Sequence, residues 1–580
     1  MWTNSQKAID SCINIINFRF LSCEIFVKNR KSNILPVTNL TFSYEYINCK
    51  ISLFCGYIQF NFIIKMTSKK FVTFAALLLF IKLGNQNASS THVETSTSPK
   101  SETKSDSNIQ EDGGLSAQDL DELIEQAKIM AMNVGLITRT KAHKDKNDEA
   151  EFVPFTLFPS PFPHKLFLQA YNIQKEMNLL YFLISLDHKF LEETLQTVAE
   201  TNASVRGILE IFKKVNEEGN KQPITLVLER SDYMAHVNNE NEQNELKQIE
   251  VNIGQMGGPV RADRITKIHR HLMKKNGHDL TNMPENGAST IIAKGLYTAW
   301  KSFGDPEAIM VVVAGRMYQN FEQHQLSQKI REMSDYKIKI AHLSLAECGE
   351  KLTLDENDFI LRYNGKAVAL VYHKTLVIKP SQEQLNARLK IERSTAIKCP
   401  TVALELACTK KVQQALALPG VLERFFTNNE VVDSIKSTFA GLWGLEKDDE
   451  ETRQRIEDAI ANPDNYVLKP SEEGGGNNFW GEEIPQKLRT FKPAERAAHI
   501  LMQRLYPMPM KNFLVRPFKP VKLEEVVSEL SIYGFLLGNA HEKSVQSNEC
   551  RGFMLRTKLE KTTEGGIGAG GGFHDSLYLY

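Results

Sequence analysis

From Ser116 onward, helical and strand-like hydrophobic patterns alternate along the chain. A capping sequence, Ser116-Ala-Gln-Asp119, precedes apolar positions spaced three and four residues apart, which predicts a helix over 116–130. Further helices are expected at residues 188–217, 265–275, 289–303, 382–399 and 412–417. Short β-rich runs predict strands at residues 224–228, 309–313, 338–341, 367–372, 466–469 and 512–516. This alternation predicts an α/β protein.

The first 65 residues show neither helical nor alternating periodicity. Two apolar runs, 47–54 and 56–64, are too short to span a bilayer. We interpret residues 1–65 as an extension upstream of the true start at Met66. A small extra domain built from short strands is the alternative.

Residues 66–88 have the layout of a secretory signal peptide. Met66-Thr-Ser-Lys-Lys is a short basic segment, residues 71–81 are apolar, and small and polar residues follow at 83–88. Residues 89–115 are rich in Ser, Thr, Lys and Glu, which predicts a disordered linker. If translation starts at Met1, residues 71–81 are an internal apolar segment or weak anchor. The glycosylation sequence at Asn202 matters only for an exported chain.

The composition of the 580-residue chain narrows the class of protein. It is 42% hydrophobic and 24% charged, with 70 basic and 70 acidic side chains, which argues against a general nucleic-acid binder. Four of the eight cysteines fall in the first 65 residues, so the body has too few for a disulfide scaffold. We expect no nucleic-acid partner and no stable membrane span in the mature chain.

Two glycine-rich segments are candidates for phosphate chemistry. Residues 466–478 read as a strand that ends in Lys469, followed by Glu473 and three glycines. Lysine neutralises phosphate charge, a carboxylate binds Mg²⁺, and glycine lets backbone N–H groups approach phosphate oxygens. A surface turn is the alternative interpretation.

The second segment, residues 564–572, formally matches a dinucleotide fingerprint. Only nine residues follow Gly571, which leaves no room for the helix and strand that this fingerprint requires. A mobile lid over a phosphate site and a plain flexible tail remain. No Walker-type loop, zinc-spaced cysteine pair or catalytic serine elbow is evident, and we interpret His269 and His271 as structural or surface residues.

Ordered segments from Ser116 to the C-terminus resemble the eukaryotic glutathione synthetases. The segments that carry the resemblance include residues 154–160, 230–234, 246–250, 392–394, 398–400, 409–414, 438–442, 469–483 and 555–558. The resemblance implies an ATP-grasp fold with an inserted substrate-binding α/β domain and glycine-rich lid loops. It divides the body into a first ligase part (116–305), the substrate-binding domain (306–410) and a C-terminal part with the lid (411–580).

The resemblance also implies a homodimer that ligates γ-glutamylcysteine to glycine through an acyl phosphate, with ATP and Mg²⁺. The metal ligands it implies are Glu250, Asn252 and Glu473. Lys410, Lys469 and Arg556 take catalytic roles. The other residues implied at the nucleotide site are Gly474, Gly475, Asn478, Trp480, Met502, Gln503, Arg504, Leu505, Glu529, Lys558 and Glu564.

The substrate half departs from the family pattern. Arg230 and Arg556 are kept, and the resemblance also implies Ile567 and Gly568 as substrate-binding residues. Gln255 and Gly257 stand where two serines are expected, and Gly315 replaces a glutamine. A substrate loop of the family is absent, which leaves Lys374 as its only charge equivalent. These changes predict altered substrate specificity with intact ATP binding.

Two functions follow from this pattern. The first is an ATP-dependent peptide ligase that uses a γ-glutamyl dipeptide or a relative of it, and glycine or another amine. The second is a secreted binding or effector protein with weak or no ligase activity. In combining an export signal with an altered substrate pocket, the sequence resembles the secreted glutathione-synthetase-like proteins of plant-parasitic nematodes. We expect secretion if the signal from Met66 is used, and a cytoplasmic location if it is not.

Overall fold

The computed structural model divides the chain into two compact units, residues 1–106 and 107–580. In the first unit the structure describes four strands. In the second it describes residues 116–140, 142–143, 148–238, 243–315, 321–374, 379–471, 477–563, 565–567 and 570–580. The predicted signal peptide beyond Met66 and the predicted linker lie outside the described residues.

The first unit contains an antiparallel sheet in the order β2-β1-β3-β4. Its strands are β1 (Leu21–Lys28), β2 (Ile34–Pro36), β3 (Ile47–Cys55) and β4 (Ile58–Met66). The two apolar runs at 47–54 and 56–64 thus form β3 and most of β4, and Met66 is the last residue of β4.

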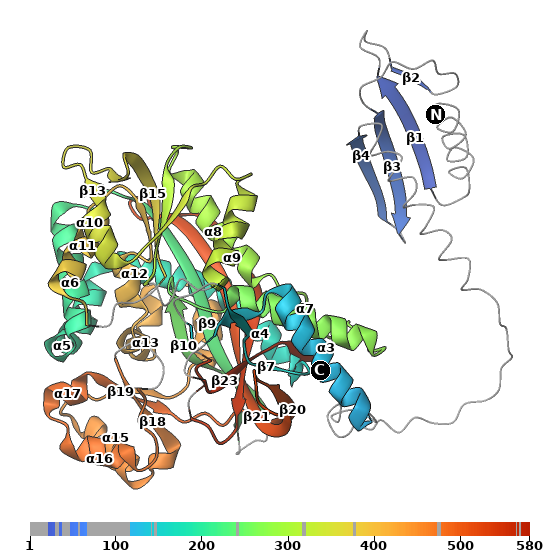
Figure 1. Cartoon of the computed structure of the whole chain (residues 1–580). Coiled ribbons are helices and arrows are strands. Elements are labelled where there is room, and N and C mark those ends of the chain that lie inside the picture. The colour runs from blue at the N-terminus through green and yellow to red at the C-terminus, as the bar shows by residue number, and fades with distance from the viewer. Residues whose placement is uncertain are drawn as a thin grey trace. The chain divides into compact units, whose positions relative to one another are not determined.

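The main sheet of the body has seven strands in the order β10-β9-β21-β20-β7-β23-β22. These are β7 (Phe155–Thr156), β9 (Ile224–Asn238), β10 (Gln243–Ile253), β20 (Met510–Val515), β21 (Lys522–Asn539), β22 (Ser544–Leu559) and β23 (Gly572–Asp575). An additional pairing of β21 with β22 closes β21, β22, β23, β7 and β20 into a ring. Strand β21 joins this ring to β9 and β10, so it links both halves of the sheet (Figure 1).

A second sheet packs against α8 (Ala288–Ser302) and α9 (Phe321–Met333). Its strands are β11 (Ile309–Val313), β12 (Ile340–Leu343), β13 (Leu352–Leu354), β14 (Leu361–Tyr363), β15 (Lys366–His373) and β16 (Ile397–Cys399). Strands β12, β11, β15 and β16 are parallel neighbours in that order. The chain moves from β11 to β12 on one side and later to β15 on the other, so the ends of β11 and β15 form a switch point, where α/β sheets usually bind ligands.

A third sheet contains β17 (Leu442–Gly444), β18 (Tyr466–Pro470) and β19 (His499–Gln503). It lies with α15 (Glu450–Ala461), α16 (Glu483–Thr490) and α17 (Pro493–Ala497) at the lower left of the body (Figure 1). Two small pairs complete the strands, β5 (Ile137–Arg139) with β6 (Ala150–Phe152) and β8 (Ser160–Phe162) with β24 (Leu577–Leu579).

The α-helices cover these sheets. They are α3 (Ala117–Val134), α4 (His164–Leu186), α5 (His188–Thr201), α6 (Ala203–Glu218), α7 (Pro259–Lys275), α8 (Ala288–Ser302), α9 (Phe321–Met333), α10 (Leu345–Lys351), α11 (Gln382–Glu392), α12 (Val402–Ala407), α13 (Lys410–Leu416), α14 (Asn429–Ser437), α15 (Glu450–Ala461), α16 (Glu483–Thr490) and α17 (Pro493–Ala497). The predicted capping box at Ser116 is present and starts α3.

Several predicted boundaries are wrong for local reasons. The single helix predicted over 188–217 is two helices, because the Asn202 side chain accepts hydrogen bonds from the backbone N–H groups of Ser204 and Val205 and starts α6. Asn202 is buried, so its glycosylation sequence is explained by helix capping. The helix predicted over 382–399 ends with α11, and its last residues form β16.

The C-terminal residues are part of the core. Strand β23 pairs with β22 and β7, and β24 pairs with β8. Phe573 is buried inside the ring with Leu514 and Val526. The interpretation of the last residues as a plain flexible tail is therefore wrong, because these residues supply strands without which the ring would be open.

No helix in the described ranges combines the length and apolar character needed to cross a bilayer.

Replacing Phe573 with Ala tests the role of the C-terminal strand. We expect a loss of about 3–5 kcal/mol in the free energy of unfolding, since the substitution leaves a cavity inside the ring. Urea unfolding followed by tryptophan fluorescence measures the change.

The matched control is Tyr580→Ala, because Tyr580 is an aromatic residue of the same terminal segment but is 54% exposed. It should change stability by about 0.5 kcal/mol or less. Equal effects of the two substitutions would show that β23 does not stabilise the body.

Candidate functional site

One face of β9 and β21 changes from apolar to charged along the strands. Leu228 and Phe535 on this face pack in a buried cluster with residues of α8. The polar residues that follow on the same face lie opposite one another in three rows: Asn252, Arg230 and Tyr533; Glu250, Asp232 and Ser531; and Glu529, Arg556 and His574. Because paired side chains lie close together on one face of a sheet, the strand register assembles this part of the site.

Arg230 is fixed by a forked ion pair. Its Nε and Nη2 atoms donate to the two carboxylate oxygens of Asp232 at 2.8 and 2.6 Å. Its Nη1 donates to the carbonyl oxygen of Gly257 at 3.2 Å. Such a bidentate geometry holds the guanidinium plane in one orientation. Arg230 therefore joins the sheet to the loop that follows β10.

Glu250 lies among four cations, Lys410, Lys469, Arg556 and Arg230, which we call the cation cluster. Burial by itself raises the pKa of Glu250, but the cation cluster outweighs burial and lowers this pKa from 4.5 to about 2. The Asn252 side-chain amide donates to Glu250 at 3.3 Å. Glu250 is therefore ionised and can offer its carboxylate oxygens to a metal ion. The neighbouring Asn252 carries an amide oxygen of the same use.

Two members of the cation cluster come from outside the main sheet. Lys469 lies on β18, is 6% exposed, and donates from Nζ to the carbonyl oxygen of Ile249 at 3.2 Å. Lys410 is the first residue of α13 and is equally buried. Segments separated by more than 200 residues in the sequence thus meet at one point.

Glu529 and Arg556 form a close ion pair across β21 and β22. Burial raises the pKa of Glu529, against the lowering effect of Arg556. The carboxylate expected near a ribose is thus directed at a guanidinium in this structure.

The stretch expected to border the adenine forms and follows β19. Met502 is buried opposite Val467 of β18, and the Gln503 side chain accepts a hydrogen bond from the backbone of Gly441 at 3.1 Å. Leu505 is partly buried. Strand β19 also pairs Ile500 with Lys469, which places this stretch beside a member of the cation cluster.

Trp480 and Asn478 flank Phe479, which lies beside β18 on the edge opposite to β19. Phe479, between them, bridges Leu468 on β18. The guanidinium of Arg504 lies 5.9 Å from the centre of the Trp480 ring and forms an ion pair with Asp464. The predicted nucleotide residues of this region therefore converge on the three-stranded sheet.

The predicted substrate residues converge on the loop after β10. Gly257 accepts hydrogen bonds from Arg230 and from the Tyr533 hydroxyl at 2.9 Å. Gln255 is partly buried two residues earlier. A side chain on the neighbouring Gly258, whose φ is 89°, would collide with Met554, so this loop can pass over the sheet only with glycine there.

Lys374 reaches this loop from the second sheet, and Gly315 lies at the same end of that sheet. Both follow parallel strands, β15 and β11, at the switch point. The Lys374 ammonium donates to the carbonyl oxygen of Met256 at 2.6 Å. Burial lowers the pKa of Lys374 to about 8, against the raising effect of Glu322.

The second glycine-rich segment connects β22 to β23. Lys558 donates to the carbonyl oxygen of Thr563 at 2.9 Å, and Gly571 donates to that of Gly566 at 3.1 Å. Ile567 lies between them and is partly buried. A Cβ atom on Gly572 would collide with the Gly565 carbonyl, so the two arms of the connection approach closely.

Five predicted site residues lie outside the described residues: Glu473, Gly474, Gly475, Glu564 and Gly568. Their roles stay predictions. Within the described residues, no three His, Cys, Asp or Glu side chains form a group suited to holding a metal. The predicted metal set is therefore represented there by Glu250 and Asn252. His269 is buried between Ser576 and Thr156, which confirms a structural role for this residue.

Sequence reasoning missed three residues that shape the site: Asp232, Tyr533 and Glu322. Asp232 and Tyr533 could have been found, because Arg230-x-Asp232 and Glu529-x-Ser531-x-Tyr533 show the alternation of one strand face. Glu322, which accepts from the backbone N–H of Val260, joins α9 to α7 and has no local signal.

Glu250→Gln tests the charge balance of the site. The stability that the low pKa provides is fully present above pH 4.5, the ordinary value, and is lost as the pH falls towards 2. The variant should lose on the order of 3 kcal/mol at pH 7, because a buried charge cluster loses one partner. The gap in unfolding temperature between wild type and variant should narrow from pH 4.5 downward.

Glu482→Gln, a change on an exposed residue, is the control and should match wild type at every pH. A gap for Glu250→Gln that stays constant from pH 7 to pH 3 would contradict the low pKa.

Comparisons with known proteins agree with this geometry. A family model of the eukaryotic glutathione synthase ATP-binding domain matches residues 117–579. Glutathione synthetase of Homo sapiens is 37% identical over 472 residues, which are 80% of this chain and 97% of that protein. The chloroplastic glutathione synthetase of Arabidopsis thaliana is 37% identical over 437 residues, covering 73% of this chain and 78% of its own length.

A solved structure is also similar. It is a glutathione synthetase-like effector (GSS30) from Globodera pallida in its apo form, with a TM-score of 0.66 and 31% identity over 80% of this chain and 98% of that one. The mixed α/β body with several sheets is consistent with the glutathione synthetase-like ATP-grasp fold. The chain belongs to the eukaryotic glutathione synthetase family, a family of ATP-dependent ligases.

Proposed function

We propose that the body is an ATP- and Mg²⁺-dependent carboxylate–amine ligase. It joins γ-glutamylcysteine or a related dipeptide to glycine or another amine through an acyl phosphate. The observation that carries this proposal is the ionised Glu250 inside the cation cluster, on a sheet face of a chain from the glutathione synthetase family.

The residues of this face suit a magnesium–nucleotide complex. Four cations surround the Glu250 carboxylate in the cluster, so a polyphosphate would find complementary positive charge there. Glu250 and Asn252 supply the hard oxygen ligands that Mg²⁺ prefers, and Glu473 is the predicted third ligand. When bound, Mg²⁺ neutralises negative charge that develops on the phosphate oxygens.

The protein's own side chains then have separate tasks. Lys410 and Lys469 meet the phosphates, and the strand that holds Met502 borders the base. Arg230 is already oriented by its fork with Asp232, so it orients a substrate carboxylate at little entropic cost. Arg556 lies on the same face and stabilises the negative charge of the acyl phosphate that the amine attacks.

The substrate half supports a changed specificity. Gly257 carries no side chain, and a Cβ atom there would meet nothing within 4 Å. Gly315 and Lys374 replace other predicted contacts at the switch point. Losing a hydrogen bond to a polar substrate costs about 0.5–1.5 kcal/mol, so three changed contacts lower the preference for the usual dipeptide by about 100-fold.

A second function is favoured by the similarity to the Globodera pallida effector. In this case the chain is exported through the signal peptide from Met66 and acts by binding, with weak or no ligase activity. Extracellular ATP is scarce, so an exported ligase would act inside another cell. We also propose that the chain forms the homodimer that the family resemblance implies.

Mg-ATP binding is tested by a thermal shift. At 100 times its dissociation constant a ligand adds about 2.7 kcal/mol of stability. We expect wild type to gain about 3 °C or more in unfolding temperature, and Lys469→Ala to lose most of this gain because the phosphates lose a buried cation.

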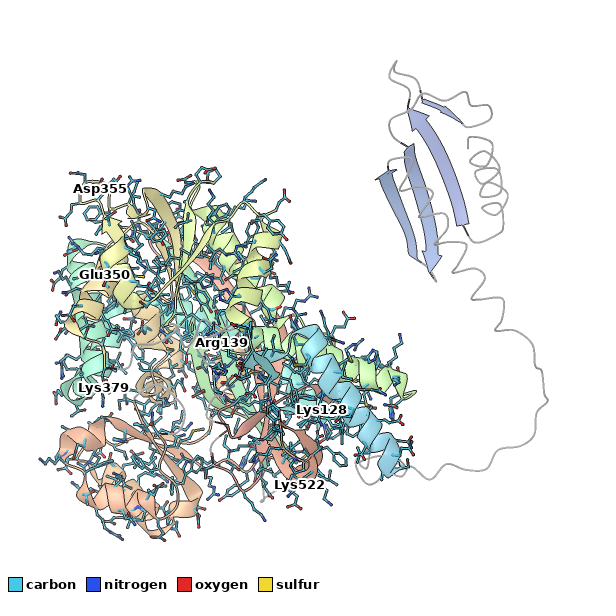
Figure 2. The ribbon with its side chains drawn as sticks, viewed as in Figure 1. Lys128, Arg139, Glu350, Asp355, Lys379 and Lys522 are labelled. Atoms are coloured by element: carbon cyan, nitrogen blue, oxygen red, sulfur yellow. The ribbon has the colours of Figure 1, made fainter. Side chains whose placement is uncertain are left out.

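Lys522→Ala is the matched control, since Lys522 is an exposed lysine of β21, labelled at the lower edge of the body in Figure 2. It should keep the full shift, and Glu473→Ala should lose it. A wild-type shift no larger than that of Glu473→Ala would contradict the proposal.

Ligase specificity is tested by ADP release across pairs of dipeptides and amines. We expect poor turnover of γ-glutamylcysteine with glycine, and a gain of about 2- to 10-fold in Gly257→Ser, because the hydroxyl restores one hydrogen bond. The backbone of Gly257 does not lie in the left-handed region, so serine fits without strain.

Gly258→Ser is the control for this change, because its side chain would collide with Met554 at a φ of 89°. It should lower both stability and turnover. Wild-type turnover equal to that of a housekeeping glutathione synthetase would show that the changed contacts are neutral. No ADP release with any pair, together with a normal Mg-ATP shift, would favour the binding function.

A further inference from the structure

Three side chains beside the site carry buried nitrogen atoms without a hydrogen-bond partner among the described residues. They are both ring nitrogens of His574, the Nε of Arg556 and the Nε of Arg261. His574 is 2% exposed, so water does not replace the missing partners at its surface. Buried donors of this kind are costly unless a ligand completes them.

The three side chains come from neighbouring elements. His574 on β23 pairs in register with Arg556 on β22. Helix α7, which carries Arg261 in its first turn, contacts both strands. Burial lowers the pKa of His574 well below its ordinary value, and the charges of Arg261 and Arg556 lower it further. The imidazole is therefore neutral at pH 7 and offers one N–H donor.

The carboxylates near these groups are already engaged. Glu529 pairs with the Nη2 atom of Arg556. Glu322 lies 3.7 Å from the Nε of Arg261 and accepts from the backbone of Val260. The remaining buried N–H groups thus belong to two guanidinium groups and one imidazole, a donor set that matches an anion.

The position of Arg261 indicates which anion. Arg261 lies four residues after Gly257, in the first turn of the helix that follows the loop contacted by Lys374, so it lies on the substrate side. Its charge also lowers the pKa of Lys374. An anion bound there is part of the acyl substrate and is not its reacting carboxylate, which must meet the nucleotide.

We propose that Arg261, Arg556 and His574 form a recognition site for the non-reacting carboxylate of the acyl substrate. Arg261 and His574 are specificity-determining residues of this site, and Arg556 connects it to the nucleotide half. The inference rests on the proposed ligase function and names the charge that its acyl substrate carries: a second carboxylate, held by the guanidinium groups and the neutral imidazole.

The test compares two probes by isothermal titration calorimetry. They are γ-glutamylcysteine and the analogue in which the glutamyl α-carboxylate is a primary amide. We expect wild type to bind the acid about tenfold more tightly or better, the range for a hydrogen bond to a charged group. Arg261→Leu and His574→Leu should each lose most of this preference and leave binding of the amide unchanged.

Lys267→Leu and His271→Leu are matched controls, because both change exposed residues of α7. Both should keep the wild-type preference. If a leucine variant does not fold, Arg261→Lys and His574→Gln keep a donor at each position and should show a partial loss.

Equal binding of acid and amide by wild type, or an unchanged preference in both variants, would overturn the inference. So would loss of the Mg-ATP thermal shift in Arg261→Leu, which would assign the site to the nucleotide. The absence of a Mg-ATP thermal shift in wild type would instead contradict the ligase proposal. Calorimetry without nucleotide would still measure whether the protein binds the acid more tightly than the amide.

Discussion

The register between β9 and β21 is the constraint on which the rest of the body depends. It places Arg230 opposite Tyr533 and Asp232 opposite Ser531, while the apolar residues of the same strands face α8. A shift of one residue would exchange the two faces and bury the charges in the core. Two effects therefore fix the register of the long strands. A shifted register would bury unpaired charges, and it would also disrupt the apolar packing on both faces of the sheet.

The charged face in turn depends on mutual compensation. Arg230 is paired with Asp232, and Arg556 with Glu529, so each arginine is oriented before any ligand arrives. Four cations act together on Glu250, and an anionic nucleotide would add negative charge to this cluster. Lys410 and Lys469 join this point from a helix and from the three-stranded sheet, so the site also ties these parts of the body to the main sheet.

Much of this arrangement could be predicted from the sequence, and the exceptions have physical causes. The strand predicted over 309–313 has the same bounds as β11, and the capping box correctly predicts the start of α3. Both features depend on local chemistry. The break at Asn202 was missed because an asparagine cap looks like any polar residue inside a helical pattern. The role of the C-terminal strand was missed because it depends on partners hundreds of residues away. Among site residues, the family resemblance supplied those that are predicted to bind ligands. Their neighbours Arg261, Glu322 and His574 emerged only from contacts between elements.

A crystal structure with Mg²⁺ and a non-hydrolysable ATP analogue would show directly whether the cation cluster binds a nucleotide. We expect the phosphates between Lys410 and Lys469, and the metal on the oxygens of Glu250 and Asn252. Phosphates bound elsewhere, with the cation cluster still facing Glu250 alone, would contradict it.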